Sequence, residues 1–272
     1  MSNQQPDIIS ALGVTSTFDA GVEVERRISF LSSYLRRSSM KALVLGISGG
    51  VDSTAAGLLA QRAVERLRDQ DYQAQFLAVR LPYGVQVDEA DAQKALEVIR
   101  PDRVVTVDIK PAADAVLAEL RRDASDLYDD ARADFHHGNI KARQRMIVQY
   151  ALAGAAGGLV IGTDQAAEAL MGFFTKFGDG AADILPLAGL NKRRVRAVAL
   201  HLGAPRELVD KVPTADLESD APLRPDEDAF GVTYEEIDDF LENKPISPIS
   251  RDRILATHRA SAHKRALPVT PE

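Results

Sequence analysis

Ser48-Gly49-Gly50-Val51-Asp52-Ser53 is the stretch that decides the fold, because it joins a buried strand to a helix. The preceding residues 42–47 (ALVLGI) form a continuous apolar run, which is typical of a buried parallel strand. The residues that follow, to about Arg68, have the Ala and Leu content of a helix. Two adjacent glycines let a ligand approach the backbone, and the helix start offers free N–H groups and a positive dipole end. This strand, turn and helix predict a phosphate-binding site.

The stretch is not a Walker A loop, which requires Gly-Lys-Ser/Thr with the lysine reaching the terminal phosphates. Asp52 stands where an extra positive charge would be expected. A carboxylate beside phosphates is tolerable when a cation bridges the two, so Asp52 implies Mg²⁺. The stretch also fails to match G-x-G-x-x-G, since Ser48 occupies the second glycine position. An ordinary strand-to-helix turn is the alternative interpretation.

Composition limits the functions that are open to the chain. Its 272 residues suffice for one large α/β domain or two small ones. There is no run of about 18 apolar residues and no amino-terminal signal pattern, so we expect a cytoplasmic protein without a membrane partner. The net charge of −7 disfavours a nucleic-acid partner, which requires a basic face. The absence of cysteine excludes disulfides, thiolate metal sites and a cysteine nucleophile.

Strands and helices alternate along much of the chain, which predicts an α/β fold with an open, mostly parallel, twisted sheet and helices on both faces. Besides the run at 42–47, strands are expected at 75–80, 103–108 and 159–162. Helices are expected at 22–37, 53–68, 88–99, from Pro111 onward, at 139–156, and at 249–265. Thr233-Tyr234-Glu235-Glu236 is a capping box that opens a further helix to about Leu241.

Two segments interrupt this pattern, and we expect both to be mobile. Residues 122–137 are irregular and highly charged, whereas residues 211–231 hold three prolines among several acids. Long segments of this kind tend to be functional lids or disordered. His136 and His137 are interpreted as exposed loop side chains, with a metal-binding pair as the alternative.

The motif at 48–53, following a hydrophobic strand, resembles the SGGxDS loop of the N-type ATP pyrophosphatases, which split ATP to AMP and pyrophosphate while adenylating a substrate. More narrowly, nearly the whole chain resembles the ammonia-dependent bacterial NAD synthetases. The supporting motifs are 80–86 (RLPYGVQ), 138–143 (GNIKAR), 162–164 (GTD), Glu168, 172–180 (GFFTKFGDG), 183–187 (DILPL), 190–192 (LNK), 213–217 (PTADL) and 263–265 (HKR). The resemblance implies a single domain over residues 1–272 with a Rossmann-like fold of the adenine nucleotide alpha-hydrolase type.

This resemblance also implies an activity: ammonia amidates nicotinic acid adenine dinucleotide (deamido-NAD) through an acyl-adenylate, giving NAD, AMP and pyrophosphate in the last step of NAD biosynthesis. Asp52 and Lys192 would be catalytic, and Asp52 and Glu168 would hold Mg²⁺. The implied ATP-binding residues are Gly46, Ile47, Ser48, Gly49, Gly50, Val51, Asp52, Ser53, Arg80, Thr163, Lys192 and Thr214. The implied deamido-NAD residues are Arg143, Lys176, Asp183, His263 and Lys264. Cationic side chains suit a pyrophosphate and a free carboxylate, whereas Asp183 is expected to meet a hydroxyl or ammonium group.

Taken singly, these residues have plainer interpretations. Lys176 and Lys192 could be solvated charges, Asp183 a turn residue before Pro186, and Glu168 part of a charged helix face. Their ordered occurrence together with the motif at 48–53 favours the functional interpretation of each.

Several properties of the reaction and the assembly stay open at this point. Without a cysteine or the length for a glutaminase domain, the expected nitrogen donor is free ammonia, unless a separate glutaminase subunit delivers it. Two rivals remain, a GMP synthetase-like enzyme acting on xanthosine monophosphate and a sensor that binds ATP without turnover. The resemblance implies a homodimer with the dinucleotide site at or near the subunit boundary. The small residues 151–157 are compatible with close helix packing in either a monomer or a dimer.

Overall fold

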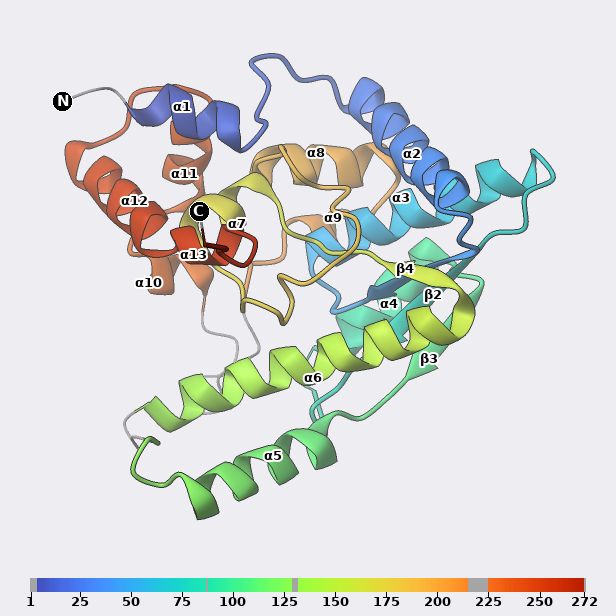
Figure 1. The fold of residues 1–272 in the computed structure, drawn as a ribbon. Coiled ribbons are helices and arrows are strands. Elements are labelled where there is room, and N and C mark those ends of the chain that lie inside the picture. Colours follow the sequence, from blue (N-terminus) through green and yellow to red (C-terminus); the bar gives the residue numbers. More distant parts are fainter. Residues whose placement is uncertain (1–3, 87, 129–131, 215–224, 272) are drawn as a thin grey trace.

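The computed structural model describes residues 4–86, 88–128, 132–214 and 225–271 of the chain. Within these residues, four parallel strands form one sheet in the order β3-β2-β1-β4. The strands are β1 (Ala42–Gly46), β2 (Gln75–Arg80), β3 (Arg103–Thr106) and β4 (Gly158–Val160). Since helices connect the parallel neighbours, the predicted open α/β sheet is confirmed (Figure 1).

Helices make up most of the remaining described chain. They are α1 (Gln4–Ala11), α2 (Ala20–Arg37), α3 (Val51–Arg68), α4 (Glu89–Ile99), α5 (Lys110–Asp123), α6 (Ala133–Ala156), α7 (Ala166–Met171), α8 (Lys192–His201), α9 (Arg206–Val209), α10 (Asp226–Phe230), α11 (Tyr234–Leu241), α12 (Pro248–Ala260) and α13 (Ala262–Arg265). None of the described helices is long and apolar enough to cross a membrane.

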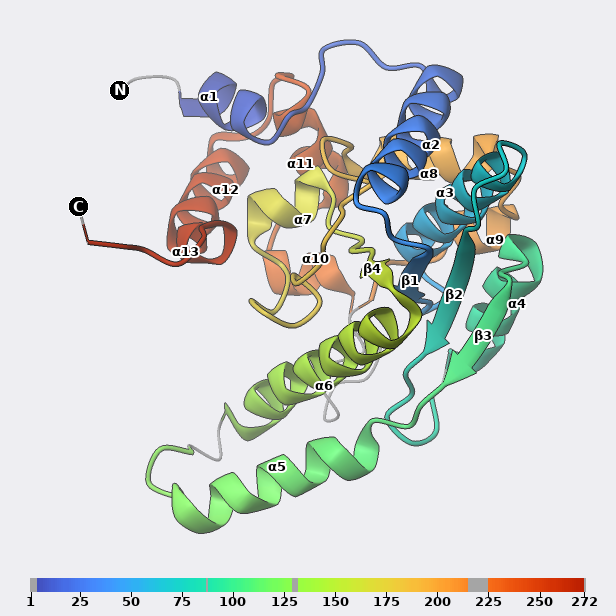
Figure 2. The same cartoon turned by 45° about the vertical axis from the view of Figure 1, so that its right-hand side comes forward.

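Helices cover both faces of the sheet, and the strand residues alternate between the two sides. On one side, Leu43, Leu45 and Phe76 pack in a core with α2, α3 and α8. On the other side, Val44 and Val79 pack in a second core with α6. β1 is buried on both faces, and this explains why its sequence is an unbroken apolar run. The predicted arrangement of helices on both faces is confirmed (Figures 1 and 2).

A separate apolar core joins α1, α7, α11 and α12 beside the sheet (Figures 1 and 2). The ring of Phe230 lies edge-on to Phe173 at 4.6 Å and to Tyr234 at 5.4 Å, which ties α10 to this group of helices. The predicted capping box is present: Thr233 accepts from the Glu236 backbone, and the Glu236 side chain accepts from the Thr233 N–H. The helix predicted at 249–265 is interrupted at Ser261, which separates α12 from α13.

The prediction that residues 122–137 are irregular is wrong at its carboxyl-terminal part. Residues 133–137 form the first turns of α6, so His136 and His137 lie on a helix and not in a loop. His137 packs edge-on against the Tyr83 ring at 5.3 Å, and His136 against Tyr128 at 5.5 Å. These tertiary contacts order a segment whose charge alone favours a loop. Residues 129–131 of this segment and 215–224 of the other lie outside the described residues.

Candidate active site

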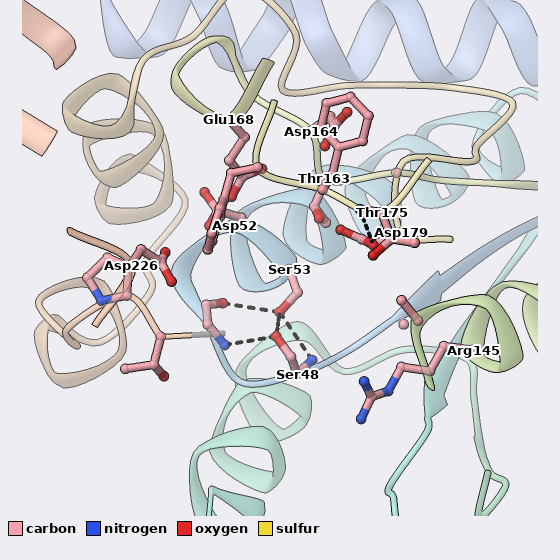
Figure 3. Close-up of a pocket in the computed structure, with 18 of the residues that line it drawn as sticks. Ser48, Asp52, Ser53, Arg145, Thr163, Asp164, Glu168, Thr175, Asp179 and Asp226 are labelled. Atoms are coloured by element: carbon pink, nitrogen blue, oxygen red, sulfur yellow. Dashed lines mark hydrogen bonds between the residues drawn. The ribbon is translucent and has the colours of Figure 1, made fainter. Parts of the chain in front are cut away.

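A cavity of about 460 Å³ lies where the carboxyl ends of β1, β2 and β4 meet the start of α3. This edge of an open α/β sheet is where ligands usually bind. Every predicted ATP-binding residue except Gly49 lines the cavity, as do Glu168 and Lys264. Residues that are far apart in the chain, from Gly46 to Thr214, thus converge on one site, as Figure 3 shows for several of them.

The motif loop is held in shape by its own hydroxyl groups. The Ser53 hydroxyl accepts from the Ser48 N–H at 3.3 Å and donates to the Gly50 carbonyl at 3.1 Å. The two serine hydroxyls lie 3.2 Å apart, and these contacts are drawn as dashed lines in Figure 3. Just before the loop, the Gly46 N–H donates to the Gln149 side chain at 2.8 Å. The loop therefore has a defined shape in which the α3 amino terminus faces the cavity.

Gly49 is absent from the lining because it faces the neighbouring helix α4. Its φ of +87° lies in the left-handed region. A Cβ at this position would lie 2.6 Å from the Ala92 nitrogen, which is closer than real contacts allow. Glycine at position 49 is thus required both by the turn and by packing on α4.

Arg80, at the end of β2, supports the loop from the sheet side. Its guanidinium donates to the Ile47 carbonyl and pairs with Glu89 at 2.6 Å. The side chain is buried, yet its Nε has no hydrogen-bond partner among the described residues. An unpaired buried donor is costly, so this N–H is available to a ligand oxygen.

Lys192 and Asp52, the two predicted catalytic residues, contact each other directly. Lys192 Nζ lies 2.6 Å from Asp52 Oδ2, and the lysine is 2% exposed. The Tyr234 ring lies beside the ammonium group, 4.9 Å from Nζ, and its hydroxyl donates to Asp226 at 2.9 Å. The sequence interpretation of Lys192 as a solvated charge is therefore wrong, because the side chain is buried and paired.

Asp238 fixes the backbone that carries Lys192. Its two carboxylate oxygens accept from the Lys192 N–H at 3.0 Å and the Arg193 N–H at 2.8 Å, at the start of α8. A carboxylate at this place satisfies orphan donors and complements the helix dipole. Burial nevertheless raises the pKa of Asp238 to about 6.

We expect Asp238→Ala to lower the free energy of unfolding by about 2–4 kcal/mol, because it leaves two N–H groups at the start of α8, one buried and one partly buried, without acceptors. Asp239→Ala is the matched control, since Asp239 makes only partly exposed ion pairs with Arg193 and Lys244. Its expected cost is about 1 kcal/mol or less. Urea denaturation of the three proteins measures both values. Equal losses for the two variants would contradict this role of Asp238.

Four further carboxylates line the same cavity as the Asp52–Lys192 pair: Asp164, Glu168, Asp179 and Asp226 (Figure 3). Burial, with Asp179 and Asp52 nearby, raises the pKa of Asp164 to about 7. Burial, with Asp52 nearby, raises the pKa of Glu168 well above its usual range. Burial also raises the pKa of Asp226. Such a concentration of perturbed acids is typical of functional sites.

Asp164→Asn should stabilise the ligand-free protein more at pH 8 than at pH 5. The pKa of Asp164 rises from 3.8 to about 7 in the folded chain, so the folded state holds this proton more tightly. Its contribution to the free energy of unfolding therefore falls as the pH rises from about 4 to about 7. The asparagine removes this loss, and we expect a gain at pH 8 that exceeds the gain at pH 5 by about 2–3 kcal/mol.

Thermal or urea unfolding at the two pH values measures this difference. Asp252→Asn, which changes an exposed residue of α12, is the control and should shift stability equally at both. A pH-independent effect of Asp164→Asn would contradict the assignment of the raised pKa.

The donor set of the cavity fits a magnesium ion that is completed by substrate phosphates. Over the described ranges, no three His, Cys, Asp or Glu side chains converge closely enough to hold a metal alone. Mg²⁺, however, is usually held by one or two carboxylates together with phosphates and water. Asp52 Oδ1 is buried without a hydrogen-bond partner in the described chain, and Glu168 lines the same cavity. These two carboxylates suit the ion that the sequence predicts.

The five residues predicted for deamido-NAD do not come together in the cavity. Lys264 lines it, and its Nζ donates to the carbonyls of Gly172 at 2.9 Å and Phe174 at 2.8 Å. Arg143, Lys176 and His263 form a connected group outside the lining: Arg143 donates to the Lys176 carbonyl at 3.2 Å, and Lys176 Nζ to the His263 carbonyl at 2.6 Å.

Asp183 is the fifth predicted residue, and it is not part of the cavity lining. It is exposed and accepts from the Val160 N–H at 2.7 Å, so its carboxylate closes the end of β4. In this structure it acts as a local backbone partner and does not line the cavity.

Sequence reasoning did not single out Asp164, Asp179, Asp226 or Tyr234 as site residues. Asp164 and Asp179 lie inside motifs that carry the resemblance, 162–164 and 172–180, so their place in these motifs is the sequence signal for a role in the site. Asp226 and Tyr234 belong to α10 and α11, and only the fold brings them to Lys192.

The chain resembles known proteins over nearly its whole length. A profile of the NAD synthase family matches residues 23–268. An NH(3)-dependent NAD(+) synthetase of Paraburkholderia phytofirmans is 62% identical, over 98% of this chain and 94% of the relative. The crystal structure of NAD+ synthetase from Burkholderia pseudomallei is 58% identical, with a TM-score of 0.84 and 97% of each chain covered. The structure of NMN synthetase from Francisella tularensis is 36% identical, with a TM-score of 0.80 and 94% of this chain and 99% of that chain covered. The resemblance inferred from the motifs is thereby confirmed, and the chain belongs to the NAD synthase family.

Proposed function

We propose that this chain uses ATP to amidate deamido-NAD with ammonia, producing NAD, AMP and pyrophosphate. The observation that carries the proposal is the cavity lined by the motif loop at 48–53, in which the buried Lys192 pairs with Asp52 of that loop. Family membership and the ammonia-dependent synthetases that the chain resembles support the choice of reaction.

The reaction has two steps. In the first, a carboxylate oxygen of deamido-NAD attacks the α-phosphorus of ATP, the bond to the β-phosphate oxygen breaks, and pyrophosphate leaves. In the second, ammonia attacks the acyl carbon, AMP leaves with the oxygen that linked it, and the nitrogen loses a proton to give the amide. Neither step needs a side-chain nucleophile, which agrees with a chain that has no cysteine.

In this proposal the residues of the cavity bind and orient the triphosphate. The N–H groups at the start of α3 and the hydroxyls of Ser48 and Ser53 meet phosphate oxygens, as helix amino termini commonly do. Lys192 supplies a positive charge where charge builds up on the leaving pyrophosphate. Asp52 and Glu168 would hold Mg²⁺, which neutralises phosphate charge when it is bound.

We further propose that the dinucleotide extends from Lys264 in the cavity to the connected group of Arg143, Lys176 and His263. Since His263 and Lys264 are adjacent, one ligand can reach both places. Ile147, one turn from Arg143 on α6, is 50% exposed, and Phe177, next to Lys176, is 57% exposed. Exposed apolar groups around a charged site favour a second subunit that covers them, and hence a homodimer. A mass measurement in solution tests this arrangement, and a monomer at assay concentrations would contradict it.

Two properties stay predictions from the sequence alone: the cytoplasmic location, and the use of ammonia that is free in solution and not delivered by a separate glutaminase subunit. Asp183 also stays a predicted substrate residue, since no contact in the cavity supports it.

A comparison of substrates tests the proposed reaction. The similarity to a protein titled NMN synthetase makes the mononucleotide acid, nicotinic acid mononucleotide, a specific competitor. Xanthosine monophosphate represents the GMP synthetase-like rival. With MgATP and ammonium in excess, amide formation should be fastest with deamido-NAD. Faster amidation of either other acid would reassign the substrate, and ATP binding without any pyrophosphate release would favour the sensor.

A further inference from the structure

The ammonium group of Lys192 occupies a place where a free divalent cation would otherwise be expected. Its Nζ touches Asp52 at 2.6 Å, and Asp52 is the carboxylate whose other oxygen is buried and without a hydrogen-bond partner among the described residues. The lysine is nearly inaccessible, and Asp238 anchors its backbone. The ammonium group is therefore held in place by its contacts with the protein.

The surroundings of this ammonium are acidic. Glu168 and Asp226 line the same cavity and interact electrostatically with Lys192, in addition to Asp52. The Tyr234 ring lies beside Nζ at 4.9 Å and adds a face that attracts cations. A site with several carboxylates and an aromatic face would collect a divalent ion from solution if no internal cation were present.

A metal ion and this ammonium compete for the same carboxylate. If a divalent ion bound Asp52 while Lys192 stayed in place, two cations would lie a few ångströms apart. Their repulsion is large even at the effective dielectric of a protein surface. Triphosphate oxygens remove the conflict, since they can accept the ammonium and also ligate the metal.

We propose that Lys192 is an internal counter-ion that prevents metal binding at Asp52 until ATP phosphates engage the lysine. The metal then enters with the triphosphate and not before it. This inference rests on the proposed metal role of Asp52, and it adds an order of binding that the reaction itself does not require. It also explains why a residue needed for phosphate is already paired with a carboxylate in the ligand-free chain.

Binding of Mn²⁺ alone tests the proposal, with free Mn²⁺ measured by electron paramagnetic resonance in the absence of nucleotide. We expect the wild-type full chain to bind weakly, with a dissociation constant of about 1 mM or higher. Lys192→Met and Lys192→Gln should bind about tenfold tighter or more, because each removes the competing charge. Lys192→Gln retains a hydrogen-bond donor for Asp52, so the same gain in both variants assigns the effect to charge.

Two controls test whether the gain in Mn²⁺ affinity arises at the Asp52–Lys192 pair. Lys192→Arg keeps the positive charge and should not gain Mn²⁺ affinity. Adding Asp52→Asn to Lys192→Met should remove the gain. Circular dichroism melting verifies that each variant is folded at the assay temperature.

Three outcomes would overturn the proposal: tight Mn²⁺ binding by nucleotide-free wild-type protein, no gain in the neutral variants, or a gain that survives Asp52→Asn. The first needs no variant, so the proposal can be refuted even if substitutions at position 192 prevent folding. Because the measurement involves no turnover, its failure is distinct from failure of the proposed function, which would appear as wild-type protein that makes no NAD.

Discussion

Asp52→Ala is expected to lower pyrophosphate release from ATP and deamido-NAD by at least about a thousandfold. The substitution removes a proposed metal ligand from the start of α3 and also leaves Lys192 buried without its partner at 2.6 Å. Both losses weaken the positioning of the triphosphate. Steady-state release of pyrophosphate with each substrate omitted in turn measures the effect.

A fall in stability has to be separated from this loss of activity. Breaking a buried ion pair by removing one partner typically costs about 3–5 kcal/mol, so the variant must be assayed below its melting temperature. Asp52→Asn keeps the shape of the side chain and should show the same loss of activity. Asp69→Ala, at the exposed far end of α3, is the control and should retain wild-type rates. Full activity of Asp52→Ala would refute the metal assignment.

Gly49→Ala is expected to lower the free energy of unfolding by about 2–4 kcal/mol and to abolish ATP binding. The backbone at position 49 has a φ of +87°, and the new Cβ would lie 2.6 Å from the Ala92 nitrogen. Backbone atoms of α4 cannot move aside as a flexible side chain could. The loop or the helix must shift, and the motif amides then lose their alignment toward the cavity.

Gly50→Ala is the matched control within the same motif. Position 50 has a φ of −78°, and the nearest atom to its added Cβ is Ser48 Oγ at an ordinary 3.5 Å. We expect its stability to change by about 1 kcal/mol or less. Urea denaturation and calorimetric ATP titration of both variants measure the difference. Equal stability of the two alanine variants would contradict the packing of Gly49 against α4.

The part of the fold that the sequence predicts well is the part encoded locally. The run at 42–47 is apolar throughout because β1 is buried on both faces, and the glycines that follow it meet a conformational demand that few residues satisfy. One cavity is lined by the motif except Gly49 and by Arg80, Thr163, Glu168, Lys192 and Thr214, as their resemblance to the family implies.

Other features depend on tertiary contacts that sequence patterns do not carry. Residues 133–137 follow a highly charged segment, yet they extend α6 because His137 packs on Tyr83 from a distant loop. Asp226 reaches the site because α10 packs beside Tyr234, whose hydroxyl donates to Asp226 and whose ring lies beside Lys192. The group of Arg143, Lys176 and His263 lies apart from the cavity, so its proposed substrate role depends on how the ligand and a second subunit extend the site.

Product analysis with the purified wild-type chain tests the central claim most directly. The protein is incubated with MgATP, deamido-NAD and ammonium, and NAD and the adenine nucleotides are separated and quantified. The account predicts equal amounts of NAD, AMP and pyrophosphate in the complete mixture, and no NAD when deamido-NAD or ammonium is omitted. Formation of ADP and phosphate in place of AMP and pyrophosphate would contradict it.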